Sequence, residues 1–149
     1  MKPDNRRINI LIADDDPDDR LLIEECLREA RVSNDITFVE DGVELMDYLL
    51  KRGKYEGRSD DFMPGLILLD LNMPRKDGRE ALKEIRMDPE LRRIPVIALT
   101  TSKEEEDISR TYDLGVSSYI TKPVSFDEFV KTLSTVTEYW LRIVHIPRS

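Results

Sequence analysis

The stretch INILIADDDPDDR, residues 8–20, places an apolar run directly before a cluster of acidic residues. A continuous run of apolar, β-branched residues is typical of a strand that is buried on both faces of a sheet. Asp16 suits the N-cap position of a helix, and Pro17 suits the first position inside it. Five aspartates stand within six positions here, and because like charges repel, each of them needs a physical role. The stretch therefore predicts a strand, a turn that gathers negative charge, and then a helix.

Four further runs have the same apolar, β-branched character as the first. They cover residues 36–39, 66–70, 96–100 and 117–121. The segments between the runs have helical periodicity, as shown by Ile23, Cys26 and Ala30. Alternating strands and helices imply parallel strands joined by right-handed crossovers, with helices on both faces. We therefore predict an α/β fold with a doubly wound, five-stranded parallel sheet and five helices in three layers.

Each predicted helix start carries a capping side chain three residues before an acid. The pairs are Asp16 with Asp19, Asp41 with Glu44, Asp77 with Glu80, Ser102 with Glu105, and Ser125 with Glu128. This is the spacing of a capping box or its acidic variant: the first side chain satisfies free backbone N–H groups, and the acid favours the helix dipole. Five helix starts are therefore predicted at defined positions.

Length and composition restrict the class of protein. A chain of 149 residues is expected to form one domain, and 40% hydrophobic with 36% charged residues is typical of a soluble globular protein. No apolar run is long enough to span a bilayer or to act as a signal peptide, so we expect a cytoplasmic protein without a membrane partner. The net charge of -8 argues against a nucleic-acid partner.

The single cysteine and the single histidine exclude two kinds of site. Cys26 cannot form an internal disulfide, and its place on the apolar stripe of the first helix predicts an inert core residue. His145 cannot build a zinc site alone, and we expect it to belong to a C-terminal tail.

Polar and charged residues follow the predicted strands. Asp14 and Asp15 end the first strand, Asp70 the third and Thr100 the fourth, and Lys122 follows the fifth. Parallel sheets place their sites at the carboxyl ends of the strands, so these residues should converge. Crowded carboxylates destabilise one another unless a divalent cation binds, and oxygen ligands alone favour Mg²⁺. Mg²⁺ beside a reactive carboxylate suits phosphoryl transfer, with the lysine as a second positive contact.

Four motifs then point to a family. They are DD at 14–15, LLDLNMPRKDG at 68–78, VIALTTS at 96–102 and YITKP at 119–123. In this order and spacing, across roughly residues 8–135, the chain resembles the receiver domain of two-component response regulators, the CheY-like superfamily. The resemblance implies a flavodoxin-like, three-layer α/β/α sandwich, with residues 1–149 forming a single receiver domain.

The resemblance also implies a phosphoacceptor site. Asp70 would accept a phosphoryl group from the phosphohistidine of a sensor histidine kinase. Asp15 and Asp70 would bind Mg²⁺ through their side chains, Asn72 through its backbone carbonyl, and Asp14 largely through water. Lys122 would contact a phosphoryl oxygen.

Two further roles are implied for nearby residues. Thr100 would move toward the phosphoryl group and Tyr119 would follow inward, which would change the surface of the fourth helix, fifth strand and fifth helix. Asn72 and Ser102 occupy the positions that tune the lifetime of the acyl phosphate in this family.

The loop at 51–65 and the final helix, which continues to Trp140, are longer than a minimal receiver needs. The loop is interpreted first as a tolerated surface insertion, and Trp140 either as a packing residue or as a dimer contact. Together they resemble the stand-alone response regulators that partner phytochrome-type histidine kinases. Such a protein would signal by homodimerising through the switch surface or the C-terminal helix, through an unidentified downstream protein, or by onward phosphotransfer.

Two other functions are considered. A nonphosphorylated pseudo-receiver would ordinarily lack part of the acidic set or Lys122, yet all of these residues are present. A phosphatase of haloacid dehalogenase type would want a second acid where Asn72 stands. We therefore expect that the protein is not an enzyme, but a phosphoacceptor that catalyses only its own phosphotransfer and autodephosphorylation.

Overall fold

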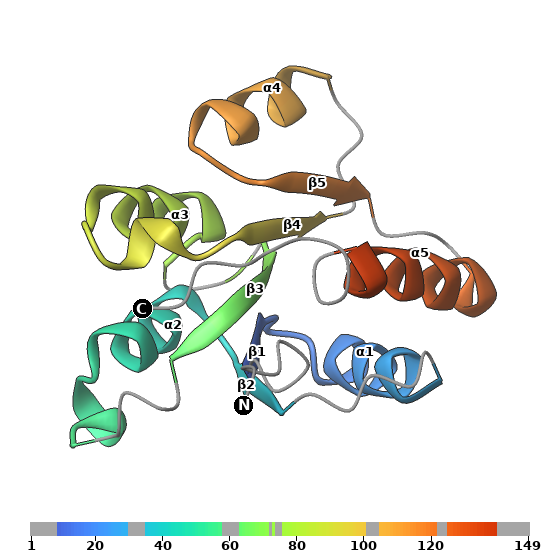
Figure 1. Cartoon of the computed structure of the whole chain (residues 1–149), viewed down its shortest axis with the longest axis horizontal. Helices are drawn as coiled ribbons and strands as arrows, with labels where there is room; N and C mark the ends of the chain where they lie inside the picture. Colours follow the sequence, from blue (N-terminus) through green and yellow to red (C-terminus); the bar gives the residue numbers. More distant parts are fainter. Residues whose placement is uncertain are drawn as a thin grey trace, which may run out of the picture.

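The computed structural model describes residues 9–29, 35–57, 63–71, 73, 76–100, 105–121 and 125–139. Within these ranges a five-stranded parallel sheet has the strand order β2-β1-β3-β4-β5 (Figure 1). The strands are β1 (Asn9–Ala13), β2 (Ile36–Val39), β3 (Pro64–Asp70), β4 (Val96–Thr100) and β5 (Ser118–Thr121). The predicted doubly wound α/β fold is confirmed.

The third strand begins two residues before the predicted start at 66. Pro64 is the first residue of β3 and pairs with Asn9, the first residue of β1. Proline is tolerated at this end of a strand because its missing N–H removes no interior ladder bond. An apolar run alone does not reveal this extension, since Pro64 and Gly65 ordinarily break strands.

The strand register brings Asp14 and Asp70 to one edge of the sheet. Ala13 pairs with Leu69, so the residues that follow them, Asp14 and Asp70, meet at the carboxyl ends of β1 and β3. The backbone N–H of Asp14 donates to the carbonyl oxygen of Val39 at 3.0 Å, which extends the contact with β2. Asp14 therefore lies just beyond the end of β1 and is still hydrogen-bonded to β2.

The structure describes five helices, and four of them begin directly after the predicted capping residue, whereas α4 begins three residues after Ser102. They are α1 (Pro17–Glu29), α2 (Gly42–Leu50), α3 (Gly78–Met87), α4 (Glu105–Asp113) and α5 (Phe126–Glu138), with short 3-10 turns η2 (Gly53–Tyr55) and η4 (Leu91–Arg93). None of the helices in the described ranges is long and apolar enough to cross a membrane.

Four of the five predicted caps lie in the described residues, and all four accept a backbone hydrogen bond. The backbone N–H of Asp18 donates to Asp16 at 2.9 Å, that of Glu44 to Asp41 at 2.7 Å, that of Arg79 to Asp77 at 3.3 Å and that of Glu128 to Ser125 at 3.2 Å. Two of these bonds reach the third helical residue, as in a capping box, and two reach the second. Ser102 lies outside the described residues.

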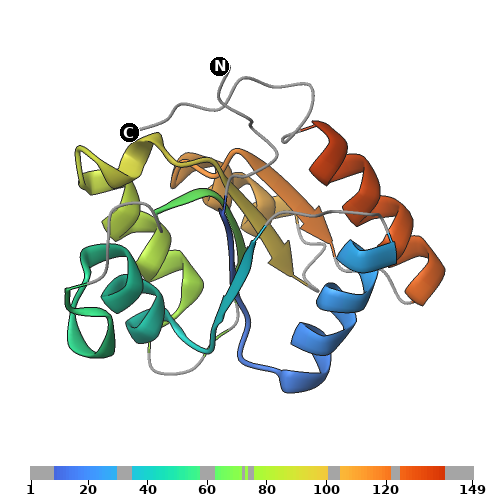
Figure 2. The same ribbon diagram turned by 60° about the horizontal axis from the view of Figure 1, so that its bottom comes forward.

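The helices cover the sheet in two layers (Figures 1 and 2). Helices α2 and α3 pack on one face, over a core that includes Leu11, Ile67 and Leu69. Helices α1 and α5 lie side by side on the other face, over a core that includes Ile12 and Leu68. Neighbouring residues of one strand enter opposite cores, so these strands must be apolar throughout.

Cys26 is fully buried in the core beneath α1 and α5, as expected. Burial, reinforced by the charge of Glu25, raises the pKa of its thiol to about 11. The thiol therefore stays protonated at neutral pH, which supports an inert role. Trp140 and His145 lie outside the described residues.

The first part of the predicted loop at 51–65 is held by specific contacts. The ring of Tyr55 in η2 packs edge-on against Tyr48 of α2, with 5.0 Å between ring centroids. The Tyr55 hydroxyl donates to Glu44 at 2.7 Å, and Lys54 forms an ion pair with the same carboxylate at 2.7 Å. The sequence does not predict these contacts, which anchor η2 to α2.

Candidate functional site

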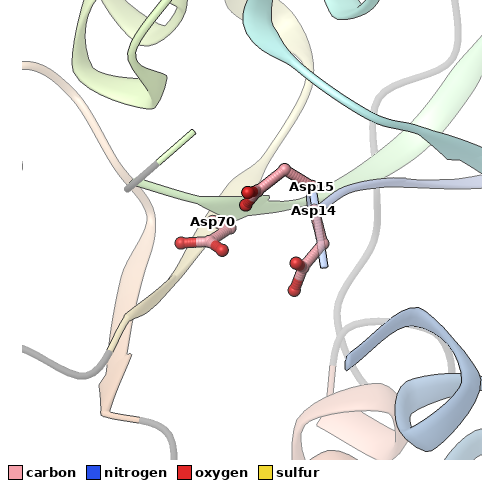
Figure 3. Close-up of side chains that lie close together, drawn as sticks. All are labelled: Asp14, Asp15 and Asp70. Atoms are coloured by element: carbon pink, nitrogen blue, oxygen red, sulfur yellow. The ribbon is translucent and has the colours of Figure 1, made fainter. Parts of the chain in front are cut away.

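Three aspartates meet at the carboxyl edge of the sheet. Asp14 and Asp15 follow β1 and Asp70 ends β3, and one carboxylate oxygen from each lies within 4.8 Å of the others (Figure 3). Asp14 is 1% exposed and Asp70 is 7% exposed, while Asp15 is open to solvent. The carboxylates of Asp14 and Asp70 are therefore largely withdrawn from water, and that of Asp15 remains accessible.

Asp14 is held more firmly than the sequence predicts. Its Oδ1 accepts the backbone N–H of Asp16 at 3.0 Å, so one carboxylate oxygen also stabilises the turn into α1. The predicted helix cap is confirmed, since Asp16 accepts the N–H of Asp18. Asp14 in addition contributes to the turn.

The backbone around Asp70 is packed tightly against the start of α3. The N–H of Gly78 donates to the carbonyl oxygen of Leu71 at 3.1 Å. A Cβ atom on Gly78 would lie 2.5 Å from the carbonyl oxygen of Asp70, closer than any real contact allows. The glycine in the LLDLNMPRKDG motif is therefore required by close approach of two backbones.

The spacing of the carboxylates suits one divalent cation. Mg²⁺ binds oxygen ligands at 2.0–2.1 Å in an octahedron, so two ligands on opposite sides are about 4 Å apart. Oxygens spread over as much as 4.8 Å can share one ion if two bind directly and the third acts through water. Asp14 suits the indirect place, because one of its oxygens already accepts a hydrogen bond.

The other predicted site residues are placed only in part. Thr100 ends β4 in register with Thr121, although its side chain is outside what the structure describes. Tyr119 on β5 is partly buried against the core beneath α2 and α3, and its N–H donates to the hydroxyl of Tyr112 at 3.1 Å. Asn72, Ser102 and Lys122 lie outside the described residues.

One residue near the aspartates was missed in the sequence. Arg20, in the first turns of α1, donates from its guanidinium to the carbonyl oxygen of Asp14 at 2.7 Å. A second nitrogen of the same group lies 3.6 Å from the carboxylate of Glu40. A signal was available, because a cation this close to a helix N-terminus opposes the helix dipole and needs another reason to be there.

Comparison with known proteins identifies the family of this chain. The sequence matches the response regulator receiver domain family over residues 10–134. The response regulator Rcp1 from Synechocystis is 39% identical over 138 residues, which cover 93% of this chain and 92% of Rcp1.

Two solved structures share the fold over the same extent, each covering 95% of this chain and 99% of the other. The phosphorylated cyanobacterial phytochrome response regulator RcpA is 42% identical with a TM-score of 0.88. The Mn²⁺-bound form of Rcp1 is 38% identical with a TM-score of 0.86. With the fold, the aspartate cluster and these relatives in agreement, the chain belongs to the response regulator receiver domain family.

Proposed function

We propose that this receiver accepts a phosphoryl group on Asp70 from the phosphohistidine of a sensor histidine kinase, with Mg²⁺ bound at the aspartate cluster. The observation that carries the proposal is the meeting of Asp14, Asp15 and Asp70 at the carboxyl edge of the sheet. A strand-end aspartate alone would be explained as a turn residue. Three converging carboxylates, two of them buried, need a functional reason.

The proposed reaction is a transfer between two side chains. A carboxylate oxygen of Asp70 attacks the phosphorus, the bond from phosphorus to the kinase imidazole nitrogen breaks, and an acyl phosphate forms. The nitrogen keeps the electron pair and takes a proton from solvent. Asp70 suits this role because its position is set by β3 and by the close contact with Gly78.

The remaining site roles complete the proposal. Asp15 and Asp70 would hold Mg²⁺ through side chains, Asn72 through its carbonyl, and Asp14 through water. The ion would offset negative charge on the phosphoryl oxygens. Lys122 would contact a phosphoryl oxygen.

Signalling would follow from a change of surface. Thr100 would turn toward the phosphoryl group and Tyr119 would move further into the core, while Asn72 and Ser102 would set the lifetime of the acyl phosphate. The hydrogen bond from the Tyr119 N–H to Tyr112 links this movement to α4.

We further propose that this receiver partners a phytochrome-type kinase. The similarity to RcpA, a cyanobacterial phytochrome response regulator, supports this partner. Homodimerisation through α4, β5 and α5, or through the C-terminal helix, would transmit the signal. Two large side chains support that surface, because Tyr112 is 47% exposed on α4 and Tyr139 is 50% exposed after α5.

Intact mass measurement tests the phosphoacceptor. The protein is incubated with Mg²⁺ and acetyl phosphate, beside an Asp70→Asn variant. The wild type should gain one phosphoryl group and the variant none. A wild type without the added mass would support the pseudo-receiver alternative, and equal gain by the variant would assign the modification to another residue.

Competition between kinases tests the partner. Phosphotransfer from an autophosphorylated phytochrome-type kinase should outpace transfer from a chemotaxis kinase, with acetyl phosphate as the partner-independent reference. Sedimentation velocity before and after phosphorylation then measures the change in oligomeric state. Equal transfer rates would exclude the phytochrome assignment, and an unchanged sedimentation coefficient would exclude a phosphorylation-dependent dimer.

A further inference from the structure

Arg20 joins the loop that follows β1 to the residue that follows β2. Its guanidinium donates to the Asp14 carbonyl oxygen at 2.7 Å and lies 3.6 Å from the carboxylate of Glu40. The side chain of Arg20 is 19% exposed, so its hydrogen bond to the Asp14 carbonyl oxygen is partly shielded from water, whereas the Glu40 side chain is 70% exposed. A hydrogen bond from a charged donor in such a place is stronger than one at an open surface.

The carbonyl that Arg20 contacts belongs to the peptide unit between Asp14 and Asp15. Rotation of this unit would move both neighbouring side chains. On its N-terminal side, the backbone N–H of Asp14 donates to the carbonyl oxygen of Val39 at 3.0 Å. The Oδ1 atom of Asp14 accepts a hydrogen bond from the backbone N–H of Asp16 at 3.0 Å. With the bond from Arg20, the backbone N–H, the carbonyl and the side chain of Asp14 each have a defined partner.

The charge of Arg20 has a carboxylate partner outside the aspartate cluster. Glu40 lies close to the guanidinium, and its own backbone N–H donates to Glu44 at 2.7 Å. An arginine without such a partner would repel a cation at the site. Glu40 offsets part of that charge, and the hydrogen bond to the Asp14 carbonyl oxygen allows Arg20 to act on the geometry of the cluster.

We propose that Arg20 is a positioning residue that orients Asp14 and Asp15 for binding of a divalent cation. This inference rests on the metal site of the proposed function and deepens it. The residue acts through the peptide unit between the two aspartates and touches no reacting atom. Supporting groups of this kind typically change metal affinity by about 10-fold to 100-fold when they are removed.

Isothermal titration calorimetry with Mg²⁺ on the full chain tests the proposal. Arg20→Ala should weaken Mg²⁺ binding by about 10-fold, the lower end of the usual effect of a supporting group. Arg20→Lys, which keeps the charge and one donor, should recover part of the affinity. Arg28→Ala is the matched control, because Arg28 lies on the same helix with an exposed ion pair to Glu24 at 3.0 Å, and its Mg²⁺ affinity should not change.

A second measurement separates positioning from general stability. The Mg²⁺ concentration that gives half the maximal rate of phosphorylation by acetyl phosphate should rise in Arg20→Ala, while the rate at saturating Mg²⁺ stays near that of the wild type. If Arg20→Ala lowers only the melting temperature, the role is structural and the proposal fails. If Mg²⁺ binds more tightly to the variant, Arg20 acts as a repelling cation and the proposal also fails.

Two controls keep the result independent of folding and of the phosphoacceptor. If Arg20→Ala does not fold, Arg20→Lys must still show weaker Mg²⁺ binding than the wild type. A wild type that binds Mg²⁺ but gains no phosphoryl group would overturn the proposed function and leave the role of Arg20 intact. A wild type without Mg²⁺ binding would overturn the role of Arg20.

Discussion

Gly78 at the start of α3 lies so close to Asp70 at the end of β3 that a Cβ atom would sit 2.5 Å from the Asp70 carbonyl oxygen. Gly78→Ala must therefore push the helix away from Asp70. We expect a loss of about 1–3 kcal/mol in the free energy of unfolding, the usual cost of overpacking, together with slower phosphorylation. Urea unfolding and intact mass measurement would check the two effects.

A second glycine provides the control for that substitution. Gly57 has φ +82 but no atom within 4 Å of a built Cβ. Gly57→Ala should cost about 1–2 kcal/mol through the left-handed backbone alone and leave the rate of phosphorylation unchanged. A Gly78→Ala protein as stable and as active as the wild type would contradict the close contact.

Asp15 should affect stability in opposite directions with and without metal. In the metal-free protein, Asp15→Asn removes one of three neighbouring negative charges, so its melting temperature should rise above that of the wild type. At an Mg²⁺ concentration 100 times Kd the wild type should gain about 2.7 kcal/mol, and the variant much less.

Thermal unfolding with Mg²⁺ and with a chelator measures both effects. Asp18→Asn is the control, because Asp18 is exposed in the first turn of α1 and favours the helix dipole. That change should lower stability slightly and equally in both conditions. A metal-free Asp15→Asn protein less stable than the wild type would exclude repulsion as the dominant effect.

The anchor of η2 should depend on pH through Glu44. Burial raises the pKa of Glu44, but hydrogen bonds from Lys54, the Glu40 amide and Tyr55 outweigh it, so the pKa is lowered below 4.5. Ionised Glu44 therefore stabilises the fold at a pH above 4.5, and this contribution is lost as the pH falls through the lower pKa of the folded state.

Urea unfolding of the wild type and Glu44→Gln between neutral pH and acid would check this direction. The difference in stability between the two proteins should be largest near neutral pH and should shrink below 4.5. Tyr55 stays a neutral donor over this range, because burial and the bond to Glu44 raise its pKa to about 12. A difference that is constant with pH would contradict the ionised anchor.

Arg86 should hold the edge of the sheet opposite the aspartates. Its guanidinium donates to the carbonyl oxygens of Gly115, Arg92 and Ile94 at 2.7, 2.8 and 2.9 Å. Lysine cannot reach three acceptors in that fixed geometry, so Arg86→Lys should cost about 1–3 kcal/mol. Hydrogen exchange should then quicken in the turn between α4 and β5, while Arg93→Lys in η4 should change neither measurement.

Much of the fold could be predicted because local patterns and the overall structure agree. The apolar runs predicted all five strands, and capping residues such as Asp41 and Ser125 predicted where helices begin. Local signals of this kind depend on residues that are close in sequence, so no tertiary contact is needed to interpret them. The start of β3 at Pro64 was missed, because strand pairing overrode a residue type that disfavours strands.

The meeting of three aspartates could be predicted from the sequence, but the residues that support them could not. Asp14, Asp15 and Asp70 were identified because parallel strands bring their carboxyl ends to one edge, and their oxygens do meet there. The support of Arg20 and the edge-on contact between Tyr48 and Tyr55 depend on which side chains face each other across different elements. No periodicity in the chain encodes those contacts.

The sequence by itself determined the order of strands and helices and the three acidic residues of the site, because hydrophobic periodicity, helix capping and strand-end placement are local or topological properties. Only the tertiary structure decided that Asp14 is buried and accepts a hydrogen bond from the Asp16 amide, and that Arg20 donates to the Asp14 carbonyl oxygen. The tertiary structure also leaves no room for a side chain at Gly78. These features depend on distances between packed elements, which are set by close packing of the whole core.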